Sequence, residues 1–311
     1  MTDFFIFLFS LAVVLLGARF FLTASIALSK LLRLPEIVIG ATLVALATTM
    51  PETLVSLFAS ATNHSFLALG NVVGSGLVNL GLLLGIILLA GHGHEGQSQR
   101  GRRRSLILFL LVLFVYLWFL IFGGINRIGG IILITLAFIF LAYTFWYALK
   151  ESGESFILVE NKLKTHPKVI FKFLLGTFLL ILGARFLVQS GVALTQILGL
   201  PEIIIGLTLI AVGTSFPELV TALTALFSGH EKISLGNLTG ATVLTLTLAL
   251  GLAAIITDIQ IPPEILKFDL PLLLFCSGLA LAFAYLPKLP QKGLGAILIF
   301  TYFFYFVFVL I

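Results

Sequence analysis

The sequence predicts an all-α integral membrane protein with ten transmembrane helices, arranged as two inverted five-helix repeats. Composition is the first reason: the 311 residues are 60% hydrophobic and only 10% charged, with a mean hydropathy of +1.20. Such a chain has too little polar surface to cover a soluble globule. The second reason is that apolar runs of about 20 residues, the length of a spanning helix, follow one another along the chain. The third is an internal duplication.

Helices are favoured over a membrane barrel, because barrel strands alternate in polarity over roughly ten residues, whereas residues 106–122 are apolar on every face. Lys and Arg gather in every second loop, which predicts that those loops are cytoplasmic. We therefore expect a multi-pass plasma-membrane protein with both termini extracellular. This distribution of basic residues indicates the membrane topology of the chain, and it predicts no nucleic-acid partner. The ten expected spans lie near residues 4–29, 36–62, 66–90, 105–123, 128–149, 169–195, 202–228, 233–257, 268–287 and 293–311.

The duplication relates residues 17–85 to residues 183–251 at a constant offset of 166, without a gap and with 30 identities in 69 pairs. Residues 1–150 are the predicted first repeat, 151–167 a cytoplasmic linker, and 168–311 the second repeat. Because five spans is an odd number, the second repeat enters the membrane from the opposite side. Inverted repeats place a substrate site near the bilayer midplane, where the halves meet, and this favours transport by alternating access.

Two Pro-Glu pairs occupy equivalent positions in the repeats. Pro51 and Pro217 lack an amide hydrogen, so each is expected to break its helix and leave a backbone carbonyl unpaired at membrane depth. Glu52 and Glu218 follow the breaks directly. A carboxylate at the centre of a span costs at least ~2.5 kcal/mol, so two of them require a compensating partner.

Hydroxyl and amide side chains accompany these carboxylates. Thr48 and Thr214 precede Glu52 and Glu218 by four residues, and so share their helix faces. Ser75 and Asn79, in the third span, likewise share one face. The predicted oxygen ligands are those that calcium prefers over soft transition metals. Two negative charges match one divalent ion or two monovalent ions, so competition for the same carboxylates would couple their exchange.

These motifs resemble the two alpha repeats of the calcium/cation antiporter superfamily, specifically its prokaryotic sodium/calcium exchanger branch. The resemblance rests on paired G-x-T-x-x-A-x-x-[TS]-[TS]-x-P-E segments, each followed by G-N-x-x-G, and it covers nearly the whole chain. It implies direct calcium binding by Glu52 and Glu218, which also take part in sodium sites. The implied sodium ligands are Thr48, Ser75 and the Ala45 carbonyl, and in the other half Thr214 and the Ala211 carbonyl. The residues implied to support the central cavity are Thr49, Ser215 and Asn79.

The second repeat departs from the family pattern. Members commonly carry Gly-Ser-Asn followed three residues later by Asp or Asn, where this chain has Ala241 and Thr245. Ala241 offers no side-chain ligand, and Thr245 offers a weaker one. We hypothesise weaker or fewer sodium sites than in a typical member, with protons substituting.

The main alternative is therefore an exchanger of calcium or another cation for protons that uses the same carboxylates. A channel would not require inverted repeats. A membrane protease would need a catalytic motif within the spans, and none occurs in the sequence. We expect no enzymatic activity and no cofactor. The expected partners are Ca2+, Na+ or H+ and the lipid bilayer, and oligomeric state stays open.

Overall fold

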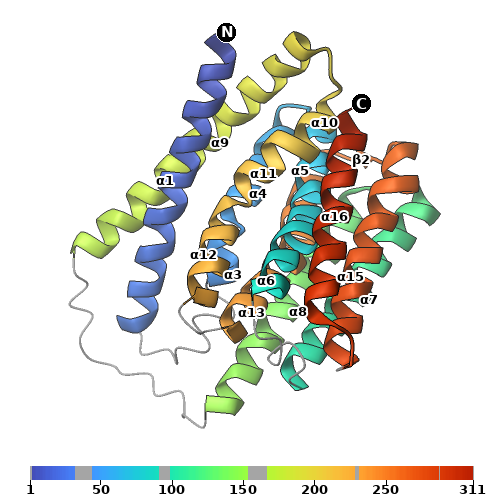
Figure 1. The fold of residues 1–311 in the computed structure, drawn as a ribbon. Helices are drawn as coiled ribbons and strands as arrows, with labels where there is room; N and C mark the ends of the chain where they lie inside the picture. Colours follow the sequence, from blue (N-terminus) through green and yellow to red (C-terminus); the bar gives the residue numbers. More distant parts are fainter. Residues whose placement is uncertain are drawn as a thin grey trace.

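A computed structural model describes residues 2–31, 44–90, 99–152, 167–227, 231–286 and 288–310. In these ranges the protein is a bundle of helices with one short pair of β-strands (Figure 1). Nine helices in these ranges are long and apolar enough to cross a membrane, and each overlaps one of the expected spans. The expected span near residues 36–62 is described only from Val44 onward. Most of the predicted linker, residues 153–166, lies outside the described ranges.

The first half of the chain contains short helical pieces where polar residues interrupt the apolar runs. Its elements are α1 (Thr2–Leu31), α3 (Ala45–Thr48), α4 (Met50–Ala61), α5 (Ser65–Leu77), the π-helical turn η2 (Val78–Leu83), α6 (Leu84–Ala90), α7 (Gln99–Phe122), strand β1 (Gly124–Ile125) and α8 (Arg127–Ser152).

The second half repeats this pattern of long and interrupted helices. Its elements are α9 (Pro167–Leu198), α10 (Glu202–Ile205), η3 (Gly206–Ile210), α11 (Ala211–Thr214), α12 (Phe216–Phe227), α13 (Glu231–Leu244), η4 (Thr245–Ala249), α14 (Leu250–Ile256), strand β2 (Ile259–Gln260), η5 (Ile265–Asp269), α15 (Leu270–Tyr285) and α16 (Gln291–Leu310).

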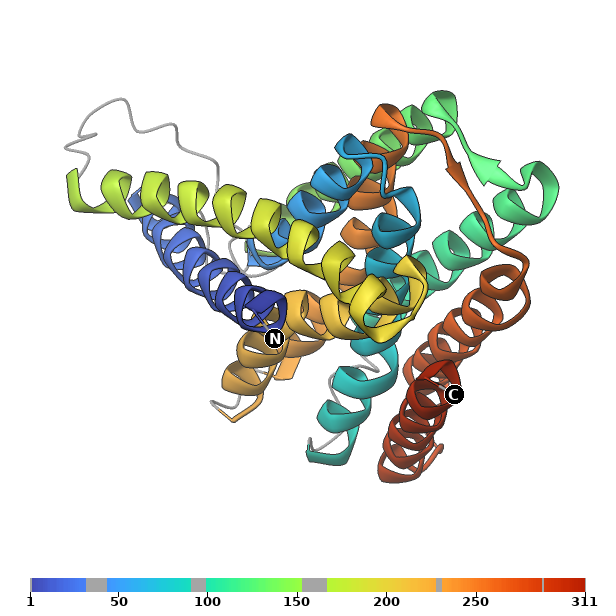
Figure 2. The ribbon, with the colours of Figure 1, turned by 90° about the horizontal axis from the view of Figure 1, so that it is seen from above.

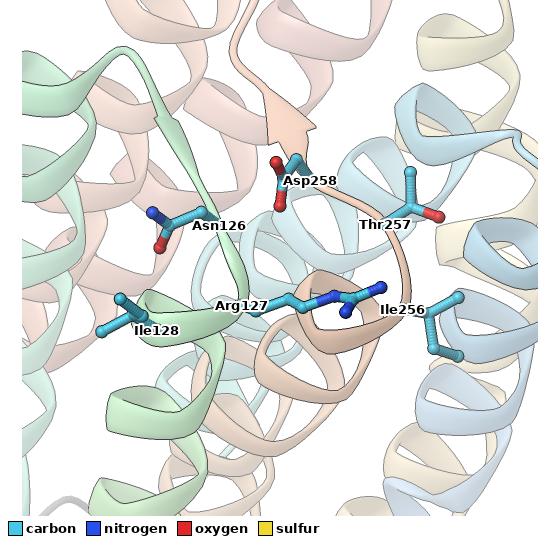
Figure 3. A pocket seen from close by; sticks show the side chains of 6 residues that line it. All are labelled: Asn126, Arg127, Ile128, Ile256, Thr257 and Asp258. Carbon is cyan, nitrogen blue, oxygen red and sulfur yellow. The ribbon is translucent and has the colours of Figure 1, made fainter.

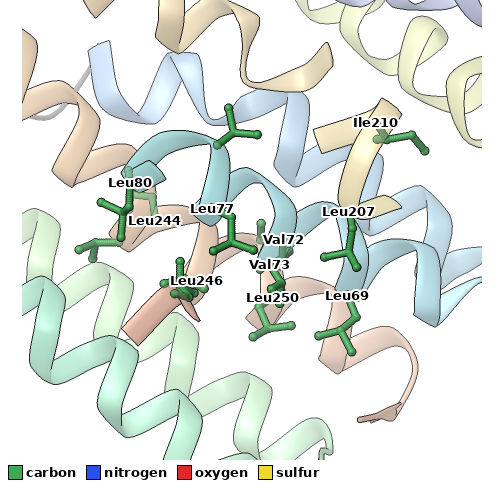
Figure 4. Packing of buried hydrophobic residues seen from close by; sticks show 14 of the residues in the cluster. Leu69, Val72, Val73, Leu77, Leu80, Leu207, Ile210, Leu244, Leu246 and Leu250 are labelled. Atoms are coloured by element: carbon green, nitrogen blue, oxygen red, sulfur yellow. The ribbon is translucent and has the colours of Figure 1, made fainter. Parts of the chain in front are cut away.

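The core is built around α5 with η2 and around α13 with η4 and α14, the most deeply buried spans of the described chain. Figure 4 shows their apolar side chains in contact, with Leu69 and Val72 from α5 near Leu207 of η3 and Leu250 of α14. The crossing helices α1 and α9 flank one side of this core, and α15 and α16 flank the other (Figure 2). Large apolar side chains cover the outward faces of these flanking helices, as expected for contact with lipid.

Glycine permits the closest helix contact between the two halves. A Cβ atom on Gly70 of α5 would lie 2.4 Å from the Ile203 carbonyl oxygen, and one on Gly206 of η3 would lie 2.6 Å from the Leu67 carbonyl oxygen. Backbone therefore meets backbone at this crossing, and small residues at helix crossings are the usual means of tight packing in membranes.

One end of the bundle, here called the β1–β2 end, holds four interhelical connections together. Gly124 pairs with Gln260 in an antiparallel β1–β2 ladder. Nearby, the Thr257 hydroxyl donates to the Ser60 carbonyl at 3.0 Å, and His64 Nδ1 lies 2.8 Å from Glu202 Oε1. Both ends of the described chain also lie at this side of the bundle in Figure 1. All four connections were predicted to be extracellular, and the structure places them together.

The substitution Gly70→Ala is expected to lower the melting temperature of the detergent-purified protein, because its methyl group would push α5 away from η3. Overpacking of this kind typically costs about 1–3 kcal/mol. Gly278→Ala is the matched control, because its methyl group would meet only the edge of the Phe109 ring, at 3.6 Å. Equal melting temperatures for the two variants would contradict the tight crossing.

Candidate functional site

Two helix breaks at equivalent positions create the site. Helix α3 ends at Thr48, and α4 begins at Met50 with Pro51 in its first turn. In the second half, α11 ends at Thr214 and α12 begins at Phe216, directly before Pro217. The predicted breaks are thus confirmed, and each one places a glutamate in the first turn of a new helix.

The two glutamates are fully buried and close enough to influence each other. Glu52 and Glu218 are each 0% exposed, and Glu52 contacts Ser215, which lies three residues before Glu218 in the chain. The Ser215 hydroxyl donates to Glu52 Oε1 at 3.1 Å, and the Thr48 hydroxyl lies beside the Glu218 carboxyl. Each carboxyl therefore faces a hydroxyl from the opposite half of the chain.

Three of the four carboxylate oxygens, Glu52 Oε2 and both oxygens of Glu218, make no hydrogen bond among the described residues. Arg19 of α1 and Arg185 of α9 are exposed, so they are not buried beside these carboxyls, and their long side chains can extend toward a membrane interface. No group of three or more His, Cys, Asp or Glu side chains suited to a metal occurs in the described ranges. A cation at this site would therefore be held by two carboxylates together with neutral oxygens.

Further buried hydroxyl and amide side chains belong to the predicted ligand set. Ser75 and Asn79 are each 0% exposed, and their side-chain polar atoms make no hydrogen bond among the described residues. The same holds for the Thr245 hydroxyl, while Ala241 is buried and contributes only a methyl group. Asn79 lies in η2 and Thr245 begins η4, and such π-helical turns are frequent at functional sites. Buried polar atoms without partners require an explanation, and a bound cation provides one for oxygens.

The predicted backbone ligands already accept hydrogen bonds from their own helices. The Ala45 carbonyl accepts the Thr49 hydroxyl at 2.7 Å and the Thr48 hydroxyl at 3.2 Å. The Ala211 carbonyl accepts the Ser215 amide at 3.1 Å. An ion bound to either carbonyl would share it with these donors.

Sequence reasoning missed the function of Asn71. Its amide nitrogen donates to the Glu52 carbonyl at 3.1 Å and to the Ser56 hydroxyl at 2.9 Å, and its carbonyl oxygen accepts the Thr214 hydroxyl at 3.1 Å. A signal existed in the sequence, because asparagine follows the glutamate by 19 residues in both repeats, at Asn71 and at Asn237.

A buried polar stripe on α4 leads from the site toward the β1–β2 end. Glu52, Ser56 and Ser60 recur every four residues and are all buried. Ser60 is joined to Thr257, which lines a pocket of about 460 Å³ together with Asp258 and Arg127 (Figure 3). In the second repeat, the positions equivalent to the two serines are Ala222 and Leu226, so this stripe belongs to the first half alone.

The substitution Ser215→Ala is expected to lower the melting temperature in cation-free buffer, because it leaves the buried Glu52 Oε1 without its hydrogen-bond donor, a loss that typically costs about 1–3 kcal/mol. Ser190→Ala is the matched control, because this buried hydroxyl bonds only to carbonyls of its own helix, at 2.7 and 3.2 Å. If both variants lose the same stability, the contact between Ser215 and Glu52 contributes nothing beyond local packing.

Comparison with known proteins places the sequence beside one family and several relatives. The sequence model of the sodium/calcium exchanger protein family matches residues 2–146 and 168–311. The inner membrane protein YrbG of Escherichia coli (strain K12) is 34% identical over 295 residues, which cover 92% of this chain and 89% of that protein. The sodium/calcium exchanger MaX1 of Methanosarcina acetivorans is 28% identical over 321 residues, covering 90% of this chain and 91% of that protein.

The fold also matches solved structures of the sodium-calcium exchanger NCX_Mj. For NCX_Mj soaked with 10 mM Na+ and zero Ca2+, the TM-score is 0.69 at 26% identity, with 98% of each chain covered. The family model and the similarity to YrbG each span most of the chain, and both halves contribute to the match. The chain therefore belongs to the sodium/calcium exchanger family of membrane proteins.

Proposed function

We propose that this chain is a secondary active antiporter that exchanges Ca2+ for Na+ across the membrane, by alternating access around a central site built from Glu52 and Glu218. The observation that carries the proposal is the burial of both carboxyls, one from each half, within reach of each other and with most of their oxygens unpaired. Two such charges in a low-dielectric interior are costly without a cation, and one divalent ion neutralises both. The protein works as a transporter and not as an enzyme.

Ten spanning helices in two inverted repeats supply the alternating access. In support, α1 and α9 contain equivalent residues and run in opposite directions in Figure 1. Glycine contacts are duplicated as well, since Gly85 of α6 meets Gly295 of α16, and its equivalent Gly251 in α14 meets Gly130 of α8. The β1–β2 end faces the outside of the cell in this proposal, together with both termini, and the transporter resides in the plasma membrane.

Coupling follows from competition for the same carboxylates. Calcium takes six to eight oxygen ligands, and the site offers carboxylate, hydroxyl, amide and carbonyl oxygens. Sodium ions that occupy the flanking positions would use the same two carboxylates, so that binding of one species displaces the other. The proposed sodium ligands are Thr48, Ser75 and the Ala45 carbonyl, with Thr214 and the Ala211 carbonyl on the other side, and the supporting residues are Thr49, Ser215 and Asn79.

A calcium/proton exchanger is the second candidate, and one observation favours it. At the two positions where the family commonly provides a serine and an acid or amide, this site has the buried Ala241 and the Thr245 hydroxyl. The second half thus lacks one sodium ligand and has a neutral hydroxyl in place of a second one. Under this alternative, protons replace sodium on the same two carboxyls.

The substitutions Glu52→Gln and Glu218→Gln are each expected to reduce calcium-45 uptake into proteoliposomes at least about a hundredfold. Removing one partner from a buried charged cluster typically costs about 3–5 kcal/mol, which corresponds to a factor of that size or larger. Glu202→Gln serves as the control, because this carboxyl is partly exposed and pairs with His64 away from the site. Uptake that survives either site substitution would refute the central site.

The double substitution Ala241→Ser with Thr245→Asp is expected to raise sodium-driven calcium uptake and to lower proton-driven uptake, because it restores the missing ligand oxygens. Ala249→Ser, at another buried position of η4, should change neither flux. The measurement compares uptake under imposed sodium and proton gradients. Full and cooperative sodium dependence in the unaltered protein would contradict the hypothesis of weakened sodium sites.

A further inference from the structure

The two equivalent asparagines, Asn71 and Asn237, are used differently in this structure. Asn71 makes three hydrogen bonds, to the Glu52 carbonyl, the Ser56 hydroxyl and the Thr214 hydroxyl. Asn237 is 0% exposed, yet neither its amide nitrogen nor its oxygen has a hydrogen-bond partner among the described residues. A buried amide without hydrogen-bond partners loses its interactions with water and gains none in return, so this asymmetry is energetically substantial.

The bonds of Asn71 join three segments from both halves. Asn71 lies on α5, its nitrogen holds α4, and its oxygen holds α11 of the second half through Thr214. The adjacent Gly70 lies at the backbone-to-backbone crossing with Gly206 of η3. Asn71 therefore lies beside a backbone-to-backbone crossing between the two halves, on the side of the site toward the β1–β2 end.

The described surroundings of Asn237 differ from those of Asn71. A Cβ atom on the adjacent Gly236 would meet the end of the Arg104 side chain, and the residues equivalent to the backbone partners of Gly70 lie outside the described ranges. The Thr48 hydroxyl, which is equivalent to that of Thr214, bonds to the Ala45 carbonyl of its own helix. The position equivalent to Ser56 is Ala222, which has no side-chain acceptor.

We propose that Asn71 and Asn237 are alternating positioning residues. In the conformation described here, Asn71 closes the β1–β2 side of the site through the Glu52 carbonyl, Ser56 and Thr214. In the opposite conformation, Asn237 makes the equivalent bonds to the Glu218 carbonyl and Thr48, while the bonds of Asn71 are broken. The inference rests on the proposed alternating access of two inverted repeats.

This exchange of partners keeps the two conformations close in energy. Each conformation satisfies one buried amide and leaves the other unsatisfied. The free-energy cost of one unsatisfied amide is therefore present in both conformations and largely cancels between them. The missing acceptor at Ala222 gives Asn237 fewer partners than Asn71. The chain without transported ions is therefore biased toward the conformation in which Asn71 is engaged.

Labelling of a cysteine reporter tests the proposal in lipid nanodiscs, where both faces of the protein are accessible. Cys276 is the only cysteine of the chain, so Cys276→Ala with Ser60→Cys yields a single thiol. Ser60 is 0% exposed and lies on the Glu52 face of α4 near the β1–β2 end. A polar maleimide reacts with this thiol only when that end opens. The buffer contains neither sodium nor calcium, so the readout does not depend on which ion is transported.

In this background, Asn71→Ala should speed labelling roughly tenfold, the population change expected for the loss of about 1.4 kcal/mol. Asn237→Ala should not speed it, because Asn237 stabilises only the opposite conformation. The proposal is overturned if Asn71→Ala leaves the rate unchanged or slows it, or if Asn237→Ala speeds labelling as well.

Two milder substitutions guard against simple misfolding. Ser56→Ala removes one acceptor from Asn71, and Ala222→Ser supplies the missing acceptor to Asn237, so both should speed labelling while the melting temperature changes little. Slower labelling in either variant would contradict the exchange of partners. Loss of calcium uptake in the glutamate variants bears on the proposed function alone, and the labelling result would stand without it.

Discussion

Two acidic side chains buried in the middle of an apolar bundle impose the condition that the rest of this structure meets. A carboxylate at the centre of a span costs at least ~2.5 kcal/mol even on permissive scales, and here two of them act on each other. Arg19 and Arg185, which lie within the described helices α1 and α9, are exposed and are not buried beside these carboxyls. In the proposed function a mobile cation is the partner of this pair, and its arrival and departure would be the transport event.

The local backbone follows from that requirement. Breaking the helices at Pro51 and Pro217 lets the glutamates begin new helices, and the π-helical turns η2 and η4 contain the buried Asn79 and Thr245. Such irregular backbone is tolerated at membrane depth only where protein encloses it. The buried segments α5 and α13 provide that enclosure, and the helices α1, α9, α15 and α16 flank them.

The spans and the helix breaks could be predicted from the sequence, because apolar runs, the internal repeat and the prolines are visible along the chain itself. The nine described spans coincide with predicted ones, and both glutamates occupy the expected helix starts. Long-range partners were not readable. The contact between Ser215 and Glu52 joins residues 163 apart, and the hydrogen bond from Tyr305 to the buried Asp269 has no counterpart in the repeat. Asn71 was visible as part of a motif, but its function depends on three partners that only the packing brings together.

The claim that the two carboxyls share one ion is tested most directly by a double-mutant cycle on equilibrium calcium binding. Calorimetry of the purified protein would compare Glu52→Gln, Glu218→Gln and the double variant with the unaltered chain. We expect strong coupling, so that either single substitution abolishes nearly all the binding free energy and the second adds little. Two independent losses that simply add would show that the carboxyls bind separate ions, and would contradict the shared central site.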